Sequence, residues 1–198
     1  MADNTPTVNT PTVADPGPLG LAGFATTTFV LSVFNANLLD AKLTLVVLPL
    51  ALFFGGIAQF AAGMWEFKRN NVFGAVAFTS YGAFWLAFDA YVKYIAGGLP
   101  AADANKATGL FLLAWTIFTV LMLIASFGTN GVIAAVFVVL TVTFVLLTWG
   151  AFAQSSGITK IGGYLGLLTA IVAWYGALAG VANGTFGKTL FPTFPFKR

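Results

Sequence analysis

Apolar residues occur in long runs, separated by short polar segments, from residue 19 to the C-terminal part of the chain. A helix that crosses the hydrocarbon core of a bilayer needs about 20 residues. Six runs reach that length: Leu19–Leu39, Leu43–Phe67, Val72–Ile95, Ala107–Phe127, Val132–Ala153 and Ile158–Ala182. The fourth and fifth runs share one charge-free stretch that the turn-like sequence Gly128-Thr129-Asn130-Gly131 divides. The pattern predicts an all-α integral membrane protein with six transmembrane helices.

Composition supports a membrane location. Of the 198 residues, 59% are hydrophobic and 8% are charged, and the net charge is +3. A soluble domain has about a quarter of its residues charged. The mean hydropathy of +0.91 is too high for a soluble enzyme, a nucleic-acid-binding protein or a disordered regulator. We therefore expect the lipid bilayer to surround this chain, and no nucleic acid to bind it.

The chain lacks the residues that most enzymes depend on. It has no cysteine and no histidine, so thiolate chemistry and the commonest transition-metal ligand are absent. Its glycines do not form a phosphate-binding loop followed by lysine and a hydroxyl residue. We expect no enzymatic activity, no cofactor and no metal site.

The polar segments predict the domain boundaries and the orientation. Residues 1–14 are rich in Thr, Pro and Asn, and we expect a disordered, solvated tail rather than a cleaved signal peptide. Residues 15–187 would form the six-helix domain, and residues 188–198 a short basic tail. Six spans put both termini on one side; cytoplasmic termini place five Lys and Arg residues inside and four outside. This small bias predicts a multi-pass protein of the plasma membrane with cytoplasmic termini.

Polar residues follow one stripe of the second span. Gly56, Gln59, Gly63 and Glu66 are spaced at i, i+3, i+7 and i+10. The stripe fits either a pore wall or a tight contact between two helices with one hydrogen bond between them. Glu66 precedes two basic residues closely. It fits an ion pair at the membrane interface or a titratable group at the mouth of a pathway.

Hydroxyl and aromatic residues suggest further polar positions in the first and third spans. Thr26–Thr28 is a run of three hydroxyls, which either line a pathway or bond back to their own helix. Phe78, Tyr81, Trp85 and Phe88 share one face of the third span. Such a stripe is more often packing than function, but the hydroxyl of Tyr81 at mid-span needs a partner.

Glycines in the sixth span repeat at spacings of four. Gly162 and Gly166 form one pair, and Gly176, Gly180 and Gly184 form a longer series. Small residues at this spacing let helix backbones approach closely in a membrane. We favour packing within the chain, with a subunit interface as the alternative.

The first span begins with a distinctive sequence. It reads Asp15-Pro16-Gly17-Pro18-Leu19-Gly20-Leu21. Asp15 is a suitable N-cap, and Pro16 suits the first helical position. The free N–H groups of a helix N-terminus could also bind an anion, although capping is the simpler interpretation.

This sequence resembles the Asn-Pro-Ala-Pro-Leu-Gly-Leu signature of the acetate uptake transporters, also called succinate–acetate permeases or the YaaH-type family. Residues Phe53–Phe67 and Phe73–Trp85 resemble the second-helix and third-helix blocks of the same family. The main departure is Asp15, where the signature has asparagine. A carboxylate at this position would repel an anion.

The resemblance implies a six-helix bundle with cytosolic termini, a hexameric assembly and one solute pathway in each protomer. The cargo would be acetate and similar small monocarboxylates, in some members succinate, with transport often linked to protons. By motif match, an apolar constriction would fall on Phe24, Tyr81 and Leu140. The residues lining or adjoining the pathway would be Thr27, Thr28, Gln59 and Trp85.

The residues also suggest how such a cargo could cross. No lysine or arginine lies at mid-span, so we hypothesise that threonine hydroxyls, Tyr81 and Gln59 donate hydrogen bonds to the carboxylate while its methyl end passes Phe24 and Leu140. Glu66 is the best acidic candidate for proton coupling. Two alternatives are a channel for small neutral solutes such as urea or ammonia, and a membrane scaffold or sensor without flux.

Overall fold

The computed structural model describes residues 13–196, so nearly all of the predicted tail 1–14 lies outside the described residues. Within the described part, six helical segments are long and apolar enough to span a membrane. They are Gly17–Asn35, Ala41–Lys68, Val72–Gly98, Asp103–Ser126, Gly131–Phe152 and Ser156–Phe186. The prediction of six spans is confirmed, with bounds that differ by a few residues.

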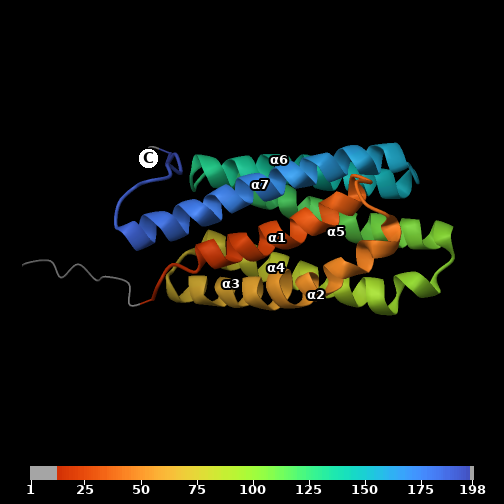
Figure 1. The fold of residues 1–198 in the computed structure, drawn as a ribbon, viewed down its shortest axis with the longest axis horizontal. Coiled ribbons are helices and arrows are strands. Elements are labelled where there is room, and N and C mark those ends of the chain that lie inside the picture. Colours follow the sequence, from red (N-terminus) through yellow and green to blue (C-terminus); the bar gives the residue numbers. More distant parts are fainter. Residues whose placement is uncertain (1–12, 197–198) are drawn as a thin grey trace, which may run out of the picture.

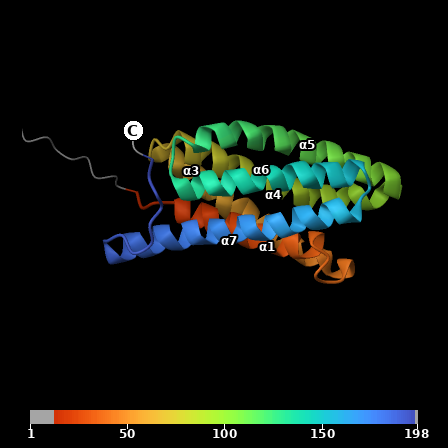
Figure 2. The same cartoon turned by 90° about the horizontal axis from the view of Figure 1, so that it is seen from above.

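These spans run alongside one another in an elongated bundle, and both ends of the described chain lie at the same end of it (Figures 1 and 2). Five spans are built on single long helices: α1 (Gly17–Asn35), α4 (Val72–Tyr94), α5 (Ala101–Ser126), α6 (Gly131–Phe152) and α7 (Ser156–Phe186). A short 3₁₀ turn, η3 (Ala96–Gly98), follows α4. The second span is composite, with η1 (Ala41–Val46), α2 (Val47–Leu52), η2 (Phe53–Ala58) and α3 (Gln59–Lys68).

The composite second span was predicted as a single helix over Leu43–Phe67 with Pro49 inside it. Its first part, η1, is a 3₁₀-helix, and Pro49 then lies in the first turn of α2, where its missing N–H leaves no helical hydrogen bond unmade. The next segment, η2, is a π-helix. Gly63 further along packs tightly on α4, because an added Cβ would lie 2.9 Å from the Cα of Thr79. Gly63 therefore fits the tight helix contact rather than the pore wall.

The start of α1 differs from the predicted cap. Pro16 takes the N-cap position, and α1 begins at Gly17. The carboxylate of Asp15 accepts a hydrogen bond from the backbone N–H of Gly17 at 2.9 Å and forms an ion pair with Arg69 in the α3–α4 turn. Asp15 thus lies one residue before the N-cap, and its carboxylate bonds to the first residue of α1 and to Arg69 together.

The glycines of α7 let it pack closely against α1 and α6. An added Cβ at Gly162 would lie 2.9 Å from the Cδ2 of Leu147 on α6, and one at Gly180 would lie 2.5 Å from the Cγ of Pro18 at the start of α1. At Gly184 no described atom outside the helix's own turn lies within 4 Å of that position. Most of the glycine series thus serves packing within the chain, as favoured from the sequence.

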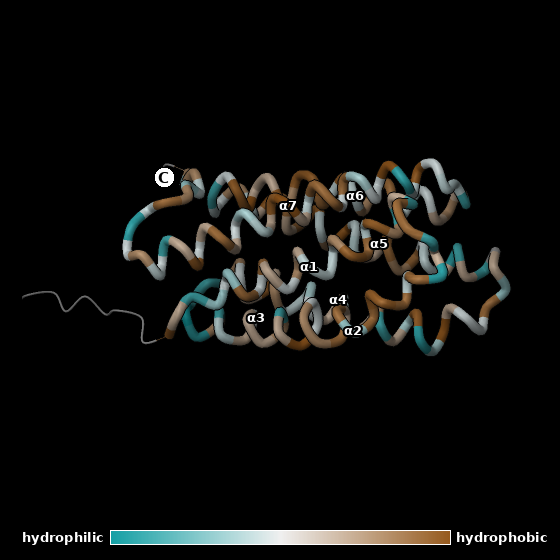
Figure 3. The backbone as a smooth tube through the Cα atoms, in the orientation of Figure 1, coloured by the Kyte–Doolittle hydropathy of each residue, from teal (hydrophilic) through white to brown (hydrophobic). Residues whose placement is uncertain are grey.

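The outer surface of the bundle is apolar along its middle. Figure 3 shows hydrophobic residues along the helices and hydrophilic ones gathered at the two ends. On α5 the exposed apolar side chains include Leu110, Ile117, Leu121 and Ile124. A soluble protein rarely exposes apolar surface on this scale, and lipid covers it in a membrane.

The C-terminal segment is anchored rather than extended, as far as residue 196. The side-chain oxygen of Asn183 accepts hydrogen bonds from the backbone N–H groups of Leu190 at 2.7 Å and Phe191 at 3.0 Å. The backbone N–H of Gly131 donates to the carbonyl oxygen of Phe194 at 2.8 Å. These bonds attach the segment to α7 and to the start of α6.

Candidate functional site

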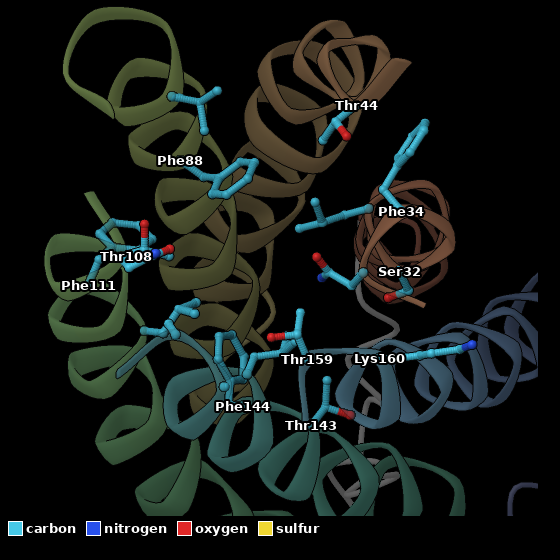
Figure 4. Close-up of a pocket in the computed structure, with 18 of the residues that line it drawn as sticks. Ser32, Phe34, Thr44, Phe88, Thr108, Phe111, Thr143, Phe144, Thr159 and Lys160 are labelled. Atoms are coloured by element: carbon cyan, nitrogen blue, oxygen red, sulfur yellow. The ribbon is translucent and has the colours of Figure 1, made fainter. Parts of the chain in front are cut away.

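A large cavity opens at the end of the bundle opposite the termini. Its volume is about 890 Å³. Residues from α1, α4, α5, α6 and α7 line it, among them Ser32, Phe88, Thr143, Phe144 and Lys160 (Figure 4). Because its outer lining comes from the α1–α2, α4–α5 and α6–α7 connections, the cavity reaches from that end of the bundle into its middle.

A second, much smaller cavity lies toward the terminal end. Its volume is about 30 Å³, enough for about one water molecule. Phe24 and Leu140 line both cavities and therefore lie between them. Tyr81 lines the small cavity, and its ring centroid is 5.8 Å from that of Phe24. The structure thus brings the three residues expected at a constriction together, all of them at most 6% exposed.

The ring of Tyr81 lies in an aromatic cluster that the sequence did not reveal. Its neighbours are Phe118 and Trp115 of α5 and Phe137 of α6, with centroid distances of 5.5, 6.1 and 6.0 Å. Phe137 and Leu140 lie on one face of α6 at a spacing of three. This spacing is visible in the sequence. It did not single out Phe137, because apolar residues occupy all sides of α6.

The hydroxyl of Tyr81 has a specific partner. It lies 2.8 Å from the Oγ1 of Thr119 on α5, and this hydroxyl in turn donates to the carbonyl oxygen of Trp115 at 2.7 Å. Thr119 is fully buried. The sequence indicated that Tyr81 needed a partner, but nothing in it selected Thr119 from the other threonines.

The four residues expected to line the pathway take different places. Thr28 and Trp85 line the large cavity, and Gln59 lines the small one. The indole Nε1 of Trp85 and the Oε1 of Gln59 are buried without a hydrogen-bond partner among the described residues. Thr27 lines neither cavity, and its hydroxyl donates to the carbonyl oxygen of Gly23 at 2.9 Å.

The remaining signature residues pack the start of α1 onto its neighbours. Pro18 faces Gly180 of α7, and Gly20 leaves room for the ring of Phe78, which an added Cβ would meet at 2.5 Å. Leu21 lines the small cavity, whereas Leu19 is exposed. The motif therefore acts mainly through helix packing.

Glu66 lies at the terminal end of the bundle and lines neither cavity. Its side chain is 2% exposed, and its Oε2 accepts a hydrogen bond from the Nδ2 of Asn71 at 2.9 Å. The Nη1 of Arg69 lies 4.0 Å from the same oxygen and also pairs with Asp15. The geometry supports the interpretation of Glu66 as a member of an ion pair.

Replacing Arg69 with alanine is expected to destabilise this end of the bundle. Glu66 would keep Asn71 but lose its cation, and a buried group left short of partners costs about 1–3 kcal/mol in the free energy of unfolding. Denaturation in detergent micelles measures the loss. Lys68→Ala, at the preceding position, is the control and should change the free energy of unfolding little. Adding Glu66→Gln to Arg69→Ala should recover stability; a further loss would contradict the ion pair.

Charge is sparse along the cavities. Among the described lining residues, Lys160 is the one that carries a charged side chain, and it lies at the outer part of the large cavity. In the prediction of orientation, Lys160 is one of the four basic residues outside. The region where the two cavities meet is surrounded by aromatic, aliphatic and neutral polar groups.

Comparison with known proteins agrees with this architecture. The succinate-acetate/proton symporter SatP of Escherichia coli K12 is 39% identical over 180 residues, covering 91% of this chain and 95% of that protein. A solved structure of the bacterial acetate channel SatP matches with a TM-score of 0.84 and 38% identity, covering 91% of this chain and 99% of that one. The six-span architecture is therefore that of a multi-pass membrane protein of known fold.

A yeast relative is also similar. Ammonia transport outward protein 2 of Saccharomyces cerevisiae is 43% identical over 176 residues, which cover 86% of this chain. The chain spans between 62% and 66% of the length of the yeast relatives it matches.

The names of these relatives describe transport and channel proteins, which confirms at the level of the family that the chain is not an enzyme. The resemblance drawn from the three sequence blocks is confirmed as well. A model of the GPR1/FUN34/yaaH family matches residues 2–198. The chain therefore belongs to the GPR1/FUN34/yaaH family.

Proposed function

We propose that this protein transports acetate and similar small monocarboxylates across the membrane, through a pathway within each protomer. The observation that carries the proposal is the meeting of two cavities at Phe24 and Leu140, with Tyr81 beside them. The large cavity gives a solute access from one side of the membrane. The apolar constriction then limits which solutes reach the small cavity beyond it.

The chemistry of the lining suits a small carboxylate. An acid with a pKa of about 4 is almost entirely an anion at neutral pH. Thr28, Trp85 and Gln59 offer neutral hydrogen-bond donors, and the apolar side chains of Phe24 and Leu140 suit a methyl group. Weak neutral donors favour conduction, because a buried cation would retain the anion.

Proton coupling and succinate transport belong to the same proposal. Channel-like passage and proton symport both fit a pathway of this kind. Glu66 is the proposed proton-coupling group because, among the described carboxylates, it is the buried one. Succinate carries a second carboxylate, so we expect the apolar constriction to pass it less readily than acetate.

We further propose cytoplasmic termini and a homo-oligomer, as a hexamer with one pathway per protomer. With this orientation the large cavity faces outward. The exposed apolar side chains of α5 offer surface for neighbouring protomers as well as for lipid. Native mass spectrometry of the protein released from micelles measures the number of chains.

Neutral solutes are the second candidate cargo. One relative carries the name of an ammonia transport protein, and no charged side chain of the described lining lies near the constriction. Neutral ammonia or urea would cross such a site without a counter-charge. A scaffold or sensor without flux is the third possibility, and any saturable flux excludes it.

Uptake of labelled acetate into proteoliposomes tests the proposal. We expect saturable uptake that other small monocarboxylates inhibit and that urea and ammonium leave unchanged. A pH gradient that accelerates uptake would indicate proton coupling, and competition by succinate would widen the substrate range. Uptake no greater than in empty liposomes, from protein shown to be folded, would overturn the proposal.

A further inference from the structure

The hydrogen bonds around Tyr81 have a defined direction. A threonine hydroxyl has one proton to donate, and that of Thr119 goes to the carbonyl oxygen of Trp115 at 2.7 Å. The 2.8 Å bond between Tyr81 and Thr119 must therefore use the proton of Tyr81. Tyr81 is the donor, Thr119 relays the bond, and the backbone of α5 is the final acceptor.

The hydrogen bond from Tyr81 to Thr119 indicates which part of the Tyr81 side chain faces the small cavity. The hydroxyl points toward α5 and has used its proton there, while the ring packs beside Phe24 at the cavity wall. Tyr81 therefore offers the cavity an aromatic surface in place of a donor. The hypothesis that Tyr81 donates to the carboxylate does not fit this arrangement.

We infer that Thr119 is a positioning residue for the constriction: it holds the hydroxyl of Tyr81 away from the pathway and so keeps the wall at Phe24 and Leu140 apolar. The inference rests on the proposed function. Thr119 lines neither cavity, so it acts through Tyr81 rather than by touching the solute.

An alternative partner for Tyr81 explains why Thr119 is needed. The Oε1 of Gln59 is buried without a partner among the described residues, and Gln59 lines the same small cavity as Tyr81. If Thr119 could not accept, the freed hydroxyl would need another acceptor, and we expect it to turn to this unpaired oxygen on the wall of the same cavity. A bond between the two side chains would close the space that the solute needs.

The test compares Thr119→Val with Thr119→Ser in acetate uptake by proteoliposomes. Valine keeps the shape and removes the acceptor, and we expect maximal uptake to fall by about threefold to tenfold, the range that one net hydrogen bond spans. Serine keeps the hydroxyl and should restore uptake. Thr116→Val is the matched control, because Thr116 is likewise buried on α5 and bonds to Thr148 at 2.9 Å and to the carbonyl of Leu112 at 2.8 Å.

A double variant separates positioning from general damage. Tyr81→Phe has no hydroxyl to misplace, so adding Thr119→Val to it should cause no further loss of uptake. The inference is overturned if Thr119→Val loses as much uptake in the Tyr81→Phe background as alone. Equal losses in Thr119→Val and Thr116→Val would overturn it too.

A spectroscopic readout keeps the inference testable without transport. The Raman doublet of tyrosine distinguishes a donating from an accepting hydroxyl, and the signal of Tyr81 is the difference between each protein and its Tyr81→Phe counterpart. A donor signature that Thr119→Val alters and Thr119→Ser keeps supports the inference. An unaltered signature contradicts it, whereas absent acetate flux in the wild type contradicts the proposed function alone.

Discussion

Replacing Tyr81 with alanine is expected to widen the constriction and relax its selectivity for size. The ring of Tyr81 fills the space between Phe24 and Phe137, with centroid distances of 5.8 and 6.0 Å. Removing it would enlarge the small cavity toward the large one. Because one methylene in a fitted apolar site is worth roughly 1–3 kcal/mol, discrimination between acetate and butyrate should fall by about tenfold or more.

Competitive uptake of the two labelled acids into proteoliposomes measures this ratio. Tyr94→Ala is the matched control, because Tyr94 is 73% exposed at the end of α4 and its loss should leave the ratio unchanged. Size-exclusion chromatography first establishes that both variants are folded. If Tyr81→Ala keeps the wild-type flux and ratio, Tyr81 is not part of the pathway.

Replacing Gly163 with alanine is expected to destabilise the packing of α7 against α1 strongly. The added Cβ would lie 2.5 Å from the carbonyl carbon of Asn35 and 2.7 Å from the Cα of Ala36, both backbone atoms of the α1 end. Backbone cannot rotate away as a side chain can. Overpacking usually costs 1–3 kcal/mol, and we expect about 3 kcal/mol in the free energy of unfolding here.

Thermal or denaturant unfolding in micelles measures this effect. Gly184→Ala supplies the control on the same helix, since no described atom outside the helix's own turn would meet its Cβ within 4 Å. That change should be neutral or stabilise by up to about 1 kcal/mol, because alanine is the better helix former. Similar losses in both variants would show that the contact with α1 is not the cause.

The spans were predictable because each is a local property of the sequence. The apolar run Val132–Ala153 and the charge-free turn before it correspond closely to α6 (Gly131–Phe152). Asn130 also caps this helix, with its side chain accepting from the N–H of Ile133 at 3.0 Å. Length, apolar composition and turn residues carry this information without any knowledge of neighbouring helices.

The site was less predictable because it depends on contacts between distant parts of the chain. Phe24 and Leu140 entered through the family resemblance, and their position between two cavities results from packing alone. Thr119 reaches Tyr81 across 38 positions of sequence. Thr27 lay in a suggestive hydroxyl run, yet its bond to Gly23 is the ordinary use of a helical threonine.

The π-helical segment Phe53–Ala58 makes the second span unusual in how it would tolerate changes of length. A π turn holds more residues than an α turn, so losing one residue there could relax the segment to an α-helix while α2 and α3 keep their facing sides. The same loss in the middle of α6 would rotate everything beyond it by about 100° and turn Phe144 out of its place. Insertions and deletions of single residues among relatives should therefore be admissible in this segment and excluded from α6.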